Sequence, residues 1–458
     1  MTLKVLQGER PNLRVAVTEK GTAQHADYES IEIGETIKFK VKDLDRYRNR
    51  NWDARVYDFL VLAAACEFCD RTLRRSQWGW ARRFELKVPV HDLAVWESPE
   101  AHSSLLSALK FLTGDEWDVS FYKRHEDADE INPQSRLELL DGSKTIIPFS
   151  NGMDSRAVGA MLDNDQHELI RLRVGANAAD RPKVGQRKVP FMTVPYEVKP
   201  SALRFNESSA RTRGFKFALL SGIAAYLVGT NDVAMPESGQ GALGPSLVQT
   251  SHGYEDYRSH PLFLGRMQRL ISAVFNHTVT YRLPRLWNTK GETLRDFAAM
   301  PQHKDEWSKT WSCWQQNRQV SVDHKRRHCG VCAACMLRRL SVHAAGLEES
   351  SDTYVWENLG ASTFEAGAAT GFNKKTKAMK QYAIAGALHL DHLAELYSSP
   401  LHQQRLDRYS WFLSEELGMT HQDARERLND LLQQHDIEWN AFLKDLDPNS
   451  FVSNWLAA

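Results

Sequence analysis

The chain has 458 residues, of which 42% are hydrophobic and 25% are charged, so it has the composition of an ordinary globular protein and the length for two or three domains. Lys+Arg and Asp+Glu both number 58, and the absence of a net positive field argues against general nucleic-acid binding. No apolar run approaches the roughly eighteen residues of a membrane span, and residues 1–5 lack the apolar core of a signal peptide. We therefore predict a cytoplasmic protein without membrane contact.

Residues 1–140 predict an N-terminal α+β accessory domain. Alternating apolar residues indicate strands at 13–17 and 37–41, and apolar residues return at helical spacing from 56 to 73. A strand, a helix and a further strand are then predicted at 84–88, 103–112 and 117–121. The acidic, proline-containing segment 125–133 is typical of a linker.

Cys66 and Cys69 form a Cys-x-x-Cys pair within the first predicted helix. Such a pair can bind a metal or act as a redox couple. No second ligand pair lies near it in the sequence, and small apolar cysteines are common on buried helix faces. We interpret both residues as buried thiols.

From residue 144 onward strands and helices alternate, which predicts a parallel sheet with helices on both faces. The predicted strands lie at 145–149, 168–174, 191–198 and 279–283, a further apolar stretch lies at 232–236, and the predicted helices lie at 155–162, 214–228 and 260–275. Ligands bind at the carboxyl ends of the strands of such sheets. The loops after Phe149, Val174 and Pro236 are therefore expected to share one crevice.

The first of these loops reads Ser150-Asn151-Gly152-Met153-Asp154-Ser155. It is a polar, glycine-containing turn between a strand and a helix, and backbone N–H groups at such a helix start bind phosphate. The loop resembles the SGGxDS loop of the PP-loop ATP pyrophosphatases, except that Asn151 stands where that family has its first glycine. The resemblance implies that residues 150–155 hold the ATP phosphates.

Four cysteines, Cys313, Cys329, Cys332 and Cys335, have the spacing C-x15-C-x2-C-x2-C. Four soft thiolates grouped in this way can close a tetrahedral zinc site, with an iron–sulfur cluster or free thiols as alternatives. Gly330 supplies a tight turn that lets the sulfurs converge. Four protein ligands leave no open position, so the predicted metal is structural. Beyond this cluster, residues 374–396 and the long stretch 403–443 are rich in Leu, Ala, Gln, Arg and Glu at helical spacing, which predicts a C-terminal helical domain over 347–458.

A phosphate loop followed by Ser312-Cys313-Trp314 and by the run from Cys329 to Arg338 resembles the 7-cyano-7-deazaguanine synthase (QueC) family, whose tail reads SCY…CGxCxxCxxR. Residues 144–346 carry the resemblance, and we define the QueC-like PP-loop domain as 141–346. Weaker matches are residues 254–258 to the family's YPDCR segment and residues 289–292 to its TKxE segment. The resemblance implies a Rossmann-like fold with one zinc, often in a homodimer.

The family activates 7-carboxy-7-deazaguanine with ATP as an acyl-adenylate, which ammonia converts to the amide, and a second adenylation then leads to the nitrile. The resemblance implies ATP, Mg2+ and Zn2+ as cofactors. It also implies Asp154 and Lys290 as catalytic residues, with Lys290 offsetting charge on the departing pyrophosphate. Arginines suit carboxylate and phosphate binding. The candidate substrate-binding residues are Arg211, Arg213, Asp256 and Arg258.

The chain departs from the family at Asn151 and in its length, which is about twice the usual one. In this it resembles the enlarged QueC-like proteins of bacterial antiphage operons, which are similar to the synthase but transfer the deazaguanine acyl group to a protein amine. We therefore expect a partner protein encoded in the same operon as the acceptor. An ordinary ammonia-using synthase, or an inactive scaffold subunit, are the alternatives. Deleting either terminal region is expected to spare adenylation and prevent transfer.

Overall fold

The computed structural model describes residues 10–22, 25–39, 53–76, 79–125, 143–163, 167–175, 191–194, 196–249, 253–315 and 319–457. Packing divides the chain into two compact units. Unit 1 comprises Met1–Phe149, Leu162–Met235 and His252–Arg282, and unit 2 comprises Ser150–Met161, Pro236–Ser251 and Leu283–Ala458. The expected division into 1–140, 141–346 and 347–458 stays a prediction, because packing groups segments without regard to their order along the chain.

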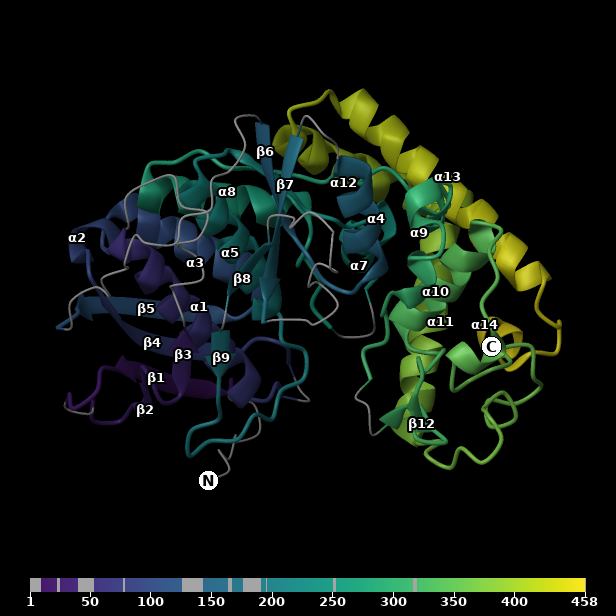
Figure 1. The fold of residues 1–458 in the computed structure, drawn as a ribbon, viewed down its shortest axis with the longest axis horizontal. Helices are drawn as coiled ribbons and strands as arrows, with labels where there is room; N and C mark the ends of the chain where they lie inside the picture. The colour runs from purple at the N-terminus through teal and green to yellow at the C-terminus, as the bar shows by residue number, and fades with distance from the viewer. Residues whose placement is uncertain are drawn as a thin grey trace. The chain divides into compact units, whose positions relative to one another are not determined.

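The first sheet of unit 1 has four parallel strands in the order β2-β1-β4-β5 (Figure 1). Its strands are β1 (Asn12–Thr18), β2 (Glu29–Glu32), β4 (Arg83–Val90) and β5 (Glu116–Lys123). Its helices are α1 (Ala54–Thr72), α2 (Leu93–Trp96) and α3 (Pro99–Thr113). Ser98 caps the N-terminus of α3, and Gly114 ends that helix with a φ of 67°, a conformation that favours glycine. The predicted helices at 56–73 and 103–112 and the predicted strands at 13–17, 84–88 and 117–121 are therefore present, and the strands of this sheet pair in parallel.

The second sheet of unit 1 has five parallel strands in the order β11-β10-β6-β7-β8. They are β6 (Ser143–Pro148), β7 (His167–Val174), β8 (Phe191–Val194), β10 (Asp232–Ala234) and β11 (Thr280–Arg282). Numbered along the chain, this is the 3-2-1-4-5 order of a Rossmann-like sheet, in which the strand order reverses between β6 and β10. The predicted parallel α/β fold class is confirmed.

Helices α1 and α5 pack against each other between the two sheets of unit 1. Helix α1 packs on the first sheet and against α5 (Thr212–Val228), which in turn packs on β6 and β7 (Figure 1). Helix α8 (Pro261–Phe275) lies against both α3 and α5. Its N-cap is the fully buried His260, whose ring nitrogen accepts the Leu262 backbone N–H at 3.1 Å. Because burial lowers the pKa of His260 to about 3, the ring stays neutral and keeps its capping lone pair.

The strand predicted at 191–198 is divided between two pairings. Its first part, β8, joins the five-stranded sheet, whereas β9 (Tyr196–Val198) pairs antiparallel with β3 (Ile37–Phe39). Sequence periodicity detects the extended backbone but not the partner, because pairing depends on residues about 160 positions away. The predicted linker falls, apart from His125, outside the described residues.

The cysteine pair of α1 is fully buried in unit 1. Both Cys66 and Cys69 have no exposed surface, and burial raises the pKa of each thiol. A buried thiol with a raised pKa carries little thiolate and is a poor nucleophile. The interpretation of these residues as packing cysteines agrees with this environment.

Unit 2 is mainly helical. Its helices are α4 (Met153–Leu162), α6 (Gly239–Ala242), α7 (Gly244–Leu247), α9 (Lys290–Ala298), α10 (Ala333–Ala344), α11 (Lys377–Ser398), α12 (Gln403–Leu417), α13 (His421–Lys444) and α14 (Phe451–Leu456), and β12 (Ser321–Val322) and β13 (Lys325–Arg326) form a small hairpin. The long helical stretch predicted near the C-terminus breaks at Gly418, whose φ is 63°. Within the part of the chain that the structure describes, no helix has both the length and the hydropathy needed to cross a membrane.

Candidate functional site

The predicted phosphate loop is a closed turn at the start of α4. The Ser155 side chain lies at its centre and accepts a hydrogen bond from the Ser150 backbone N–H at 3.1 Å. Its hydroxyl also lies 3.0 Å from the Ser150 carbonyl and 3.1 Å from that of Gly152. The Gly152 N–H donates to the Ser150 hydroxyl at 3.0 Å. The two serines therefore shape the loop, and the chain after them begins a helix whose first N–H groups are available for anions.

Asn151 occupies its position without backbone strain, because its φ lies outside the left-handed region. Its side-chain oxygen accepts a hydrogen bond from Arg156 at 2.9 Å, and its carbonyl accepts one from the Trp311 backbone N–H at 2.7 Å. The asparagine is thus held on the exposed side of the loop. The hydrogen bond from Arg156, in the first turn of α4, fixes the orientation of the Asn151 side chain. The backbone conformation at this position does not require glycine.

Asp154 and Lys290 form a buried ion pair in unit 2. Their side chains are only 14% and 10% exposed, respectively. Burial lowers the pKa of Lys290, but the charges of Asp154 and Glu237 outweigh it and raise the pKa above its ordinary value. The second carboxylate oxygen of Asp154, Oδ1, is buried and has no hydrogen-bond partner among the described residues. This arrangement suits a site in which the unpaired carboxylate oxygen binds a cation such as Mg2+ and the ammonium faces the negative charge of a phosphate.

The Thr-Lys-Gly-Glu segment positions Lys290 at the first residue of α9. Thr289 and Glu292 form a capping box, in which each side chain accepts the other residue's backbone N–H, at 3.0 and 2.8 Å. The Lys290 N–H donates to the Gln240 side chain at 2.8 Å. Threonine and glutamate therefore build the helix start, while lysine supplies the charge. The sequence did not single out Gln240, although this residue lies in the loop after Pro236, which was expected near the site.

The helices that carry the phosphate loop and Lys290 pack in one hydrophobic core. The inner face of α4 packs against α9 and α10 in a cluster that includes Met153, Ala157, Leu294, Phe297 and Val342. A shared core of this kind keeps the distance between Asp154 and Lys290 constant, because packed interiors resist deformation. Asp154, from the loop after Phe149, pairs with Lys290, and the charge of Glu237, from the loop after Pro236, acts on the same lysine. That these loops share one crevice stays a prediction. The loop after Val174 continues outside the described residues.

The four predicted metal ligands converge in unit 2. The sulfur atoms of Cys313, Cys329, Cys332 and Cys335 all lie within 4.8 Å of one another, and all four residues are buried. Backbone N–H groups donate to these sulfurs, from Cys329 to Cys313 and from Cys332 to Cys329, both at 3.2 Å. Gly330 makes the turn between them with a φ of 86°. The donor set, its closure and these N–H···S contacts fit a structural Zn2+ ion.

Arg338 and Trp311 connect this cysteine cluster to the phosphate loop. The fully buried Arg338 donates to the Thr310 hydroxyl at 2.7 Å and pairs with Glu349 at 2.6 Å. Trp311, which follows Thr310, donates from its ring to the Cys313 carbonyl at 3.0 Å and from its backbone to Asn151. The segment that carries the first cysteine is therefore hydrogen-bonded to the phosphate loop.

The four predicted substrate-binding residues lie in unit 1, and three of them pair with one another. Asp256 is held between Arg211, at 3.0 Å, and Arg258, and these charges outweigh burial and lower its pKa. Arg213 lies over the Phe217 ring, with 5.6 Å from guanidinium to ring centroid. Burial and the nearby charge of Arg258 lower the pKa of Arg213. Arg213 is the member of this group that lacks an ion pair with a described carboxylate.

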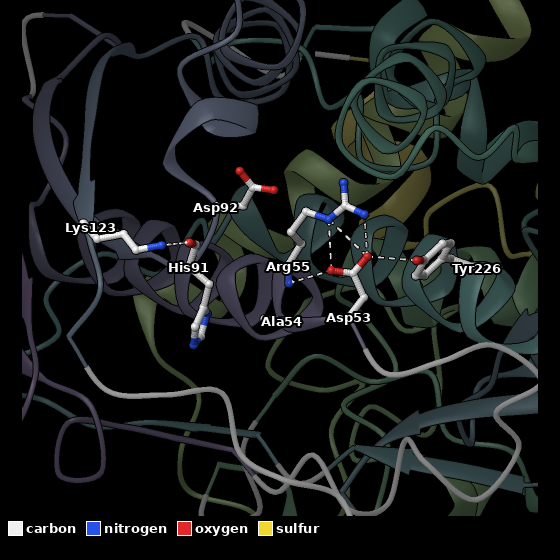
Figure 2. A pocket seen from close by; sticks show the side chains of 7 residues that line it. All are labelled: Asp53, Ala54, Arg55, His91, Asp92, Lys123 and Tyr226. Carbon is white, nitrogen blue, oxygen red and sulfur yellow. Dashed lines mark hydrogen bonds and ion pairs between the residues drawn. The ribbon is translucent and has the colours of Figure 1, made fainter.

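Unit 1 also contains a polar hollow of about 720 Å3 that the sequence did not indicate (Figure 2). Asp53, the N-cap of α1, accepts hydrogen bonds from Arg55, and Lys123 donates to the His91 carbonyl. Asp53 and Asp92 balance the charges of Arg55 and Lys123. Because these formal charges cancel, the hollow lacks the local excess of positive charge that favours a polyanion such as ATP.

A parallel sheet of 3-2-1-4-5 order, a polar loop after its first strand and a four-cysteine cluster define a Rossmann-like PP-loop class of fold. Residues 242–346 match the family model described as Queuosine biosynthesis protein QueC. Over 101 residues, 22% of this chain, the sequence is 30% identical to a 7-cyano-7-deazaguanine synthase from Rhizobium rhizogenes, and the match covers 37% of that relative's length. The region that matches the family model contains Lys290 and the four cysteines, and the loop at 150–155 precedes it.

Proposed function

We propose that the chain is an ATP-dependent ligase that adenylates 7-carboxy-7-deazaguanine or a closely similar deazaguanine carboxylate. The observation that carries the proposal is the buried Asp154–Lys290 pair, with its unpartnered carboxylate oxygen, at the start of the phosphate-loop helix. The QueC match over residues 242–346 supports the substrate class. Zn2+ would hold the cysteine cluster, and Mg2+ would accompany ATP at Asp154.

The residues suit cleavage of ATP between its α and β phosphates. A substrate carboxylate oxygen attacks the α-phosphorus, the bond to the bridging oxygen breaks, and pyrophosphate leaves with the bonding electrons. The helix N–H groups of the loop and the Lys290 ammonium stabilise the charge that develops on that leaving group. The other product is the acyl-adenylate, whose carbonyl carbon can then be attacked by an amine.

The products of ATP cleavage test the proposal. We expect AMP and pyrophosphate to form in the presence of 7-carboxy-7-deazaguanine, and no AMP to form with ATP alone. Anion-exchange chromatography of the nucleotides and a pyrophosphate assay measure both products. ADP and phosphate would show that the loop has been misinterpreted, and no cleavage at all would favour the alternative of an inactive scaffold subunit.

Arg213 is the proposed contact for the substrate carboxylate. Arg211 and Arg258 both form ion pairs with Asp256, so we assign them a structural role in the segment that precedes α8. Arg213 forms no ion pair with a described carboxylate, although the charge of Glu67 acts on it, and guanidinium groups bind carboxylates in a bidentate manner. The role of all four residues in substrate binding stays a proposal.

For the acceptor, we propose an amine of a partner protein encoded in the same operon, within an antiphage system. The support is the length of the chain, because an ammonia-using synthase needs only a small channel to the adenylate, whereas a protein amine must be held beside it. A homodimer is compatible with either acceptor. The competing proposal is synthesis of 7-cyano-7-deazaguanine from ammonia for queuosine formation.

Intact-mass spectrometry of a co-expressed partner distinguishes the two acceptors. We expect the partner to gain the mass of 7-carboxy-7-deazaguanine minus one water, because the amine attacks the acyl-adenylate, AMP leaves, and an amide remains. The partner co-expressed with an Asp154→Asn variant is the control and should stay unmodified. An unmodified partner, together with rapid conversion of ammonia and substrate to the nitrile, would establish the ordinary synthase reaction instead.

A further inference from the structure

The last long helix, α13, contacts both segments that position Lys290. Gly239, at the start of α6, is so close to α13 that an added Cβ would lie 2.5 Å from a methyl group of Leu431. Gly291, beside the lysine, faces the Glu438 carboxylate, where an added Cβ would lie 2.9 Å from one oxygen. Side chains larger than hydrogen are not tolerated at such distances, so α13 is packed directly on these two segments.

A directed chain of buried hydrogen bonds runs from Lys290 into the C-terminal helices. The Lys290 N–H donates to the Gln240 carbonyl oxygen at 2.8 Å, and the Gln240 amide nitrogen lies 2.7 Å from Nδ1 of His435. The other ring nitrogen of His435 lies 2.8 Å from the Leu390 carbonyl oxygen in α11. Burial lowers the pKa of His435 to about 4, so the neutral ring accepts at Nδ1 and donates at Nε2. Every member of the chain then has a partner of the correct polarity.

A second contact from α13 completes the start of α9. The Thr289 hydroxyl donates to the buried Glu438 carboxylate at 2.7 Å while accepting the Glu292 N–H at 3.0 Å. Glu438 thereby orients the hydroxyl so that its lone pair caps the helix that begins at Lys290. Both contacts act on backbone positions next to the lysine and leave its ammonium directed to Asp154.

We infer that His435 and Glu438 of α13 are positioning residues for Lys290, which makes the C-terminal helical region a built-in part of the adenylation site. Gln240 transmits the position of His435 to the lysine backbone, and Thr289 transmits that of Glu438. The inference rests on the proposed adenylation, in which Lys290 stabilises charge on the leaving pyrophosphate. Small displacements of such a group are costly, because its benefit depends on its distance from the charge that develops in the transition state.

The test compares His435→Leu, which removes both hydrogen bonds, with His435→Gln, whose amide can remake them. The full-length protein is assayed for AMP release with ATP and 7-carboxy-7-deazaguanine. We expect kcat to fall on the order of 10- to 100-fold in His435→Leu, with a smaller change in the KM for ATP, since a displaced transition-state contact lowers kcat. His435→Gln should recover most of the rate. Zinc content should stay at the wild-type level in both variants.

Leu428→Ala is the matched control, because Leu428 is fully buried in the same helix, in a hydrophobic cluster with Leu406 and Leu413 of α12, and its apolar side chain takes no part in the hydrogen-bond chain. It should lower the melting temperature and leave kcat nearly unchanged at a temperature where the protein is folded. Equal losses of kcat in Leu428→Ala and His435→Leu would overturn the inference, since they would show a general effect of stability. Unchanged kcat in His435→Leu would overturn it as well.

Should His435→Leu fail to fold, Gln240→Met removes the same link while keeping the side-chain volume. We expect it to lower kcat as His435→Leu does, and to cause no further loss in a Lys290→Met background, because positioning requires the group that is positioned. A further loss in that background would contradict the inference. If wild-type protein releases no AMP at all, the proposed function fails, and this outcome is distinct from active wild-type protein with a fully active Gln240→Met variant.

Discussion

Replacing Asp154 with asparagine is expected to reduce release of AMP and pyrophosphate on the order of 10²-fold or more, the usual cost of removing one preorganised charge-stabilising group. The amide keeps the shape of the carboxylate but has neither the charge that fixes Lys290 nor a strong ligand oxygen for Mg2+. The variant should also melt at a lower temperature, because a buried ion pair that loses one partner costs about 3–5 kcal/mol. Nucleotide chromatography and thermal unfolding measure the two effects.

The double variant Asp154→Asn/Lys290→Met separates stability from activity. Both buried charges are then gone, so the melting temperature should return toward the wild-type value while AMP release stays at least as low as in Asp154→Asn. Methionine matches the length of the lysine side chain and fills the same space. AMP release at a rate near wild type by this double variant would show that the pair is only structural and that cleavage occurs elsewhere.

Replacing Cys332 with serine is expected to remove zinc and most of the soluble protein together. Zinc binding in structural sites contributes about 10–16 kcal/mol in peptide systems, which exceeds or equals the total stability of most domains. The four cysteines also pack in one hydrophobic core with Trp356, Leu390 and Trp439, so the loss of metal opens that core. Zinc per chain is measured by elemental analysis, and soluble yield by fractionation.

Cys66→Ser is the matched control for this prediction. It places the same substitution at an equally buried cysteine that lies in α1, outside the cluster. It should lower stability modestly, by the cost of burying a hydroxyl, and keep the wild-type zinc content. Iron with sulfide in the purified protein, or full zinc content in Cys332→Ser, would contradict the assignment of the cluster.

The structure changes the expectation for removal of residues 347–458. The sequence pattern of this region is that of a domain separate from the adenylation site, which predicted that its deletion would spare adenylation. In unit 2, however, α11 and α13 complete the core around the cysteines, and α13 contributes His435 and Glu438 to the segments around Lys290. Deletion is now expected to expose this core and abolish adenylation. The helices resemble a separate domain in sequence because helical periodicity reports an apolar face without its partner.

Much of the local structure follows from the sequence alone. Alternating strands and helices determined the parallel α/β class, because only a crossover connection can join neighbouring parallel strands. The spacing of the cysteines indicated their cluster, since short intervals around Gly330 confine three sulfurs to one turn. The loop at 150–155 was also visible, because a polar glycine-containing turn between a strand and a helix is a local pattern. These features depend on residues that are near one another in the chain.

Only the tertiary structure decided which distant residues meet. Asp154 and Lys290 are 136 positions apart, and Gln240 and His435 are 195 apart, so no local pattern relates them. The tertiary fold also showed that Asn151 fits its loop without backbone strain. It further showed that Thr289 and Glu292 cap α9, whereas Lys290 between them pairs with the Asp154 carboxylate. Burial then sets the chemistry of these groups, because charge pairing and hydrogen bonding matter most where water is excluded. Single-sequence periodicity reports which face is buried, whereas the partner across that face is selected by the packing of the whole chain.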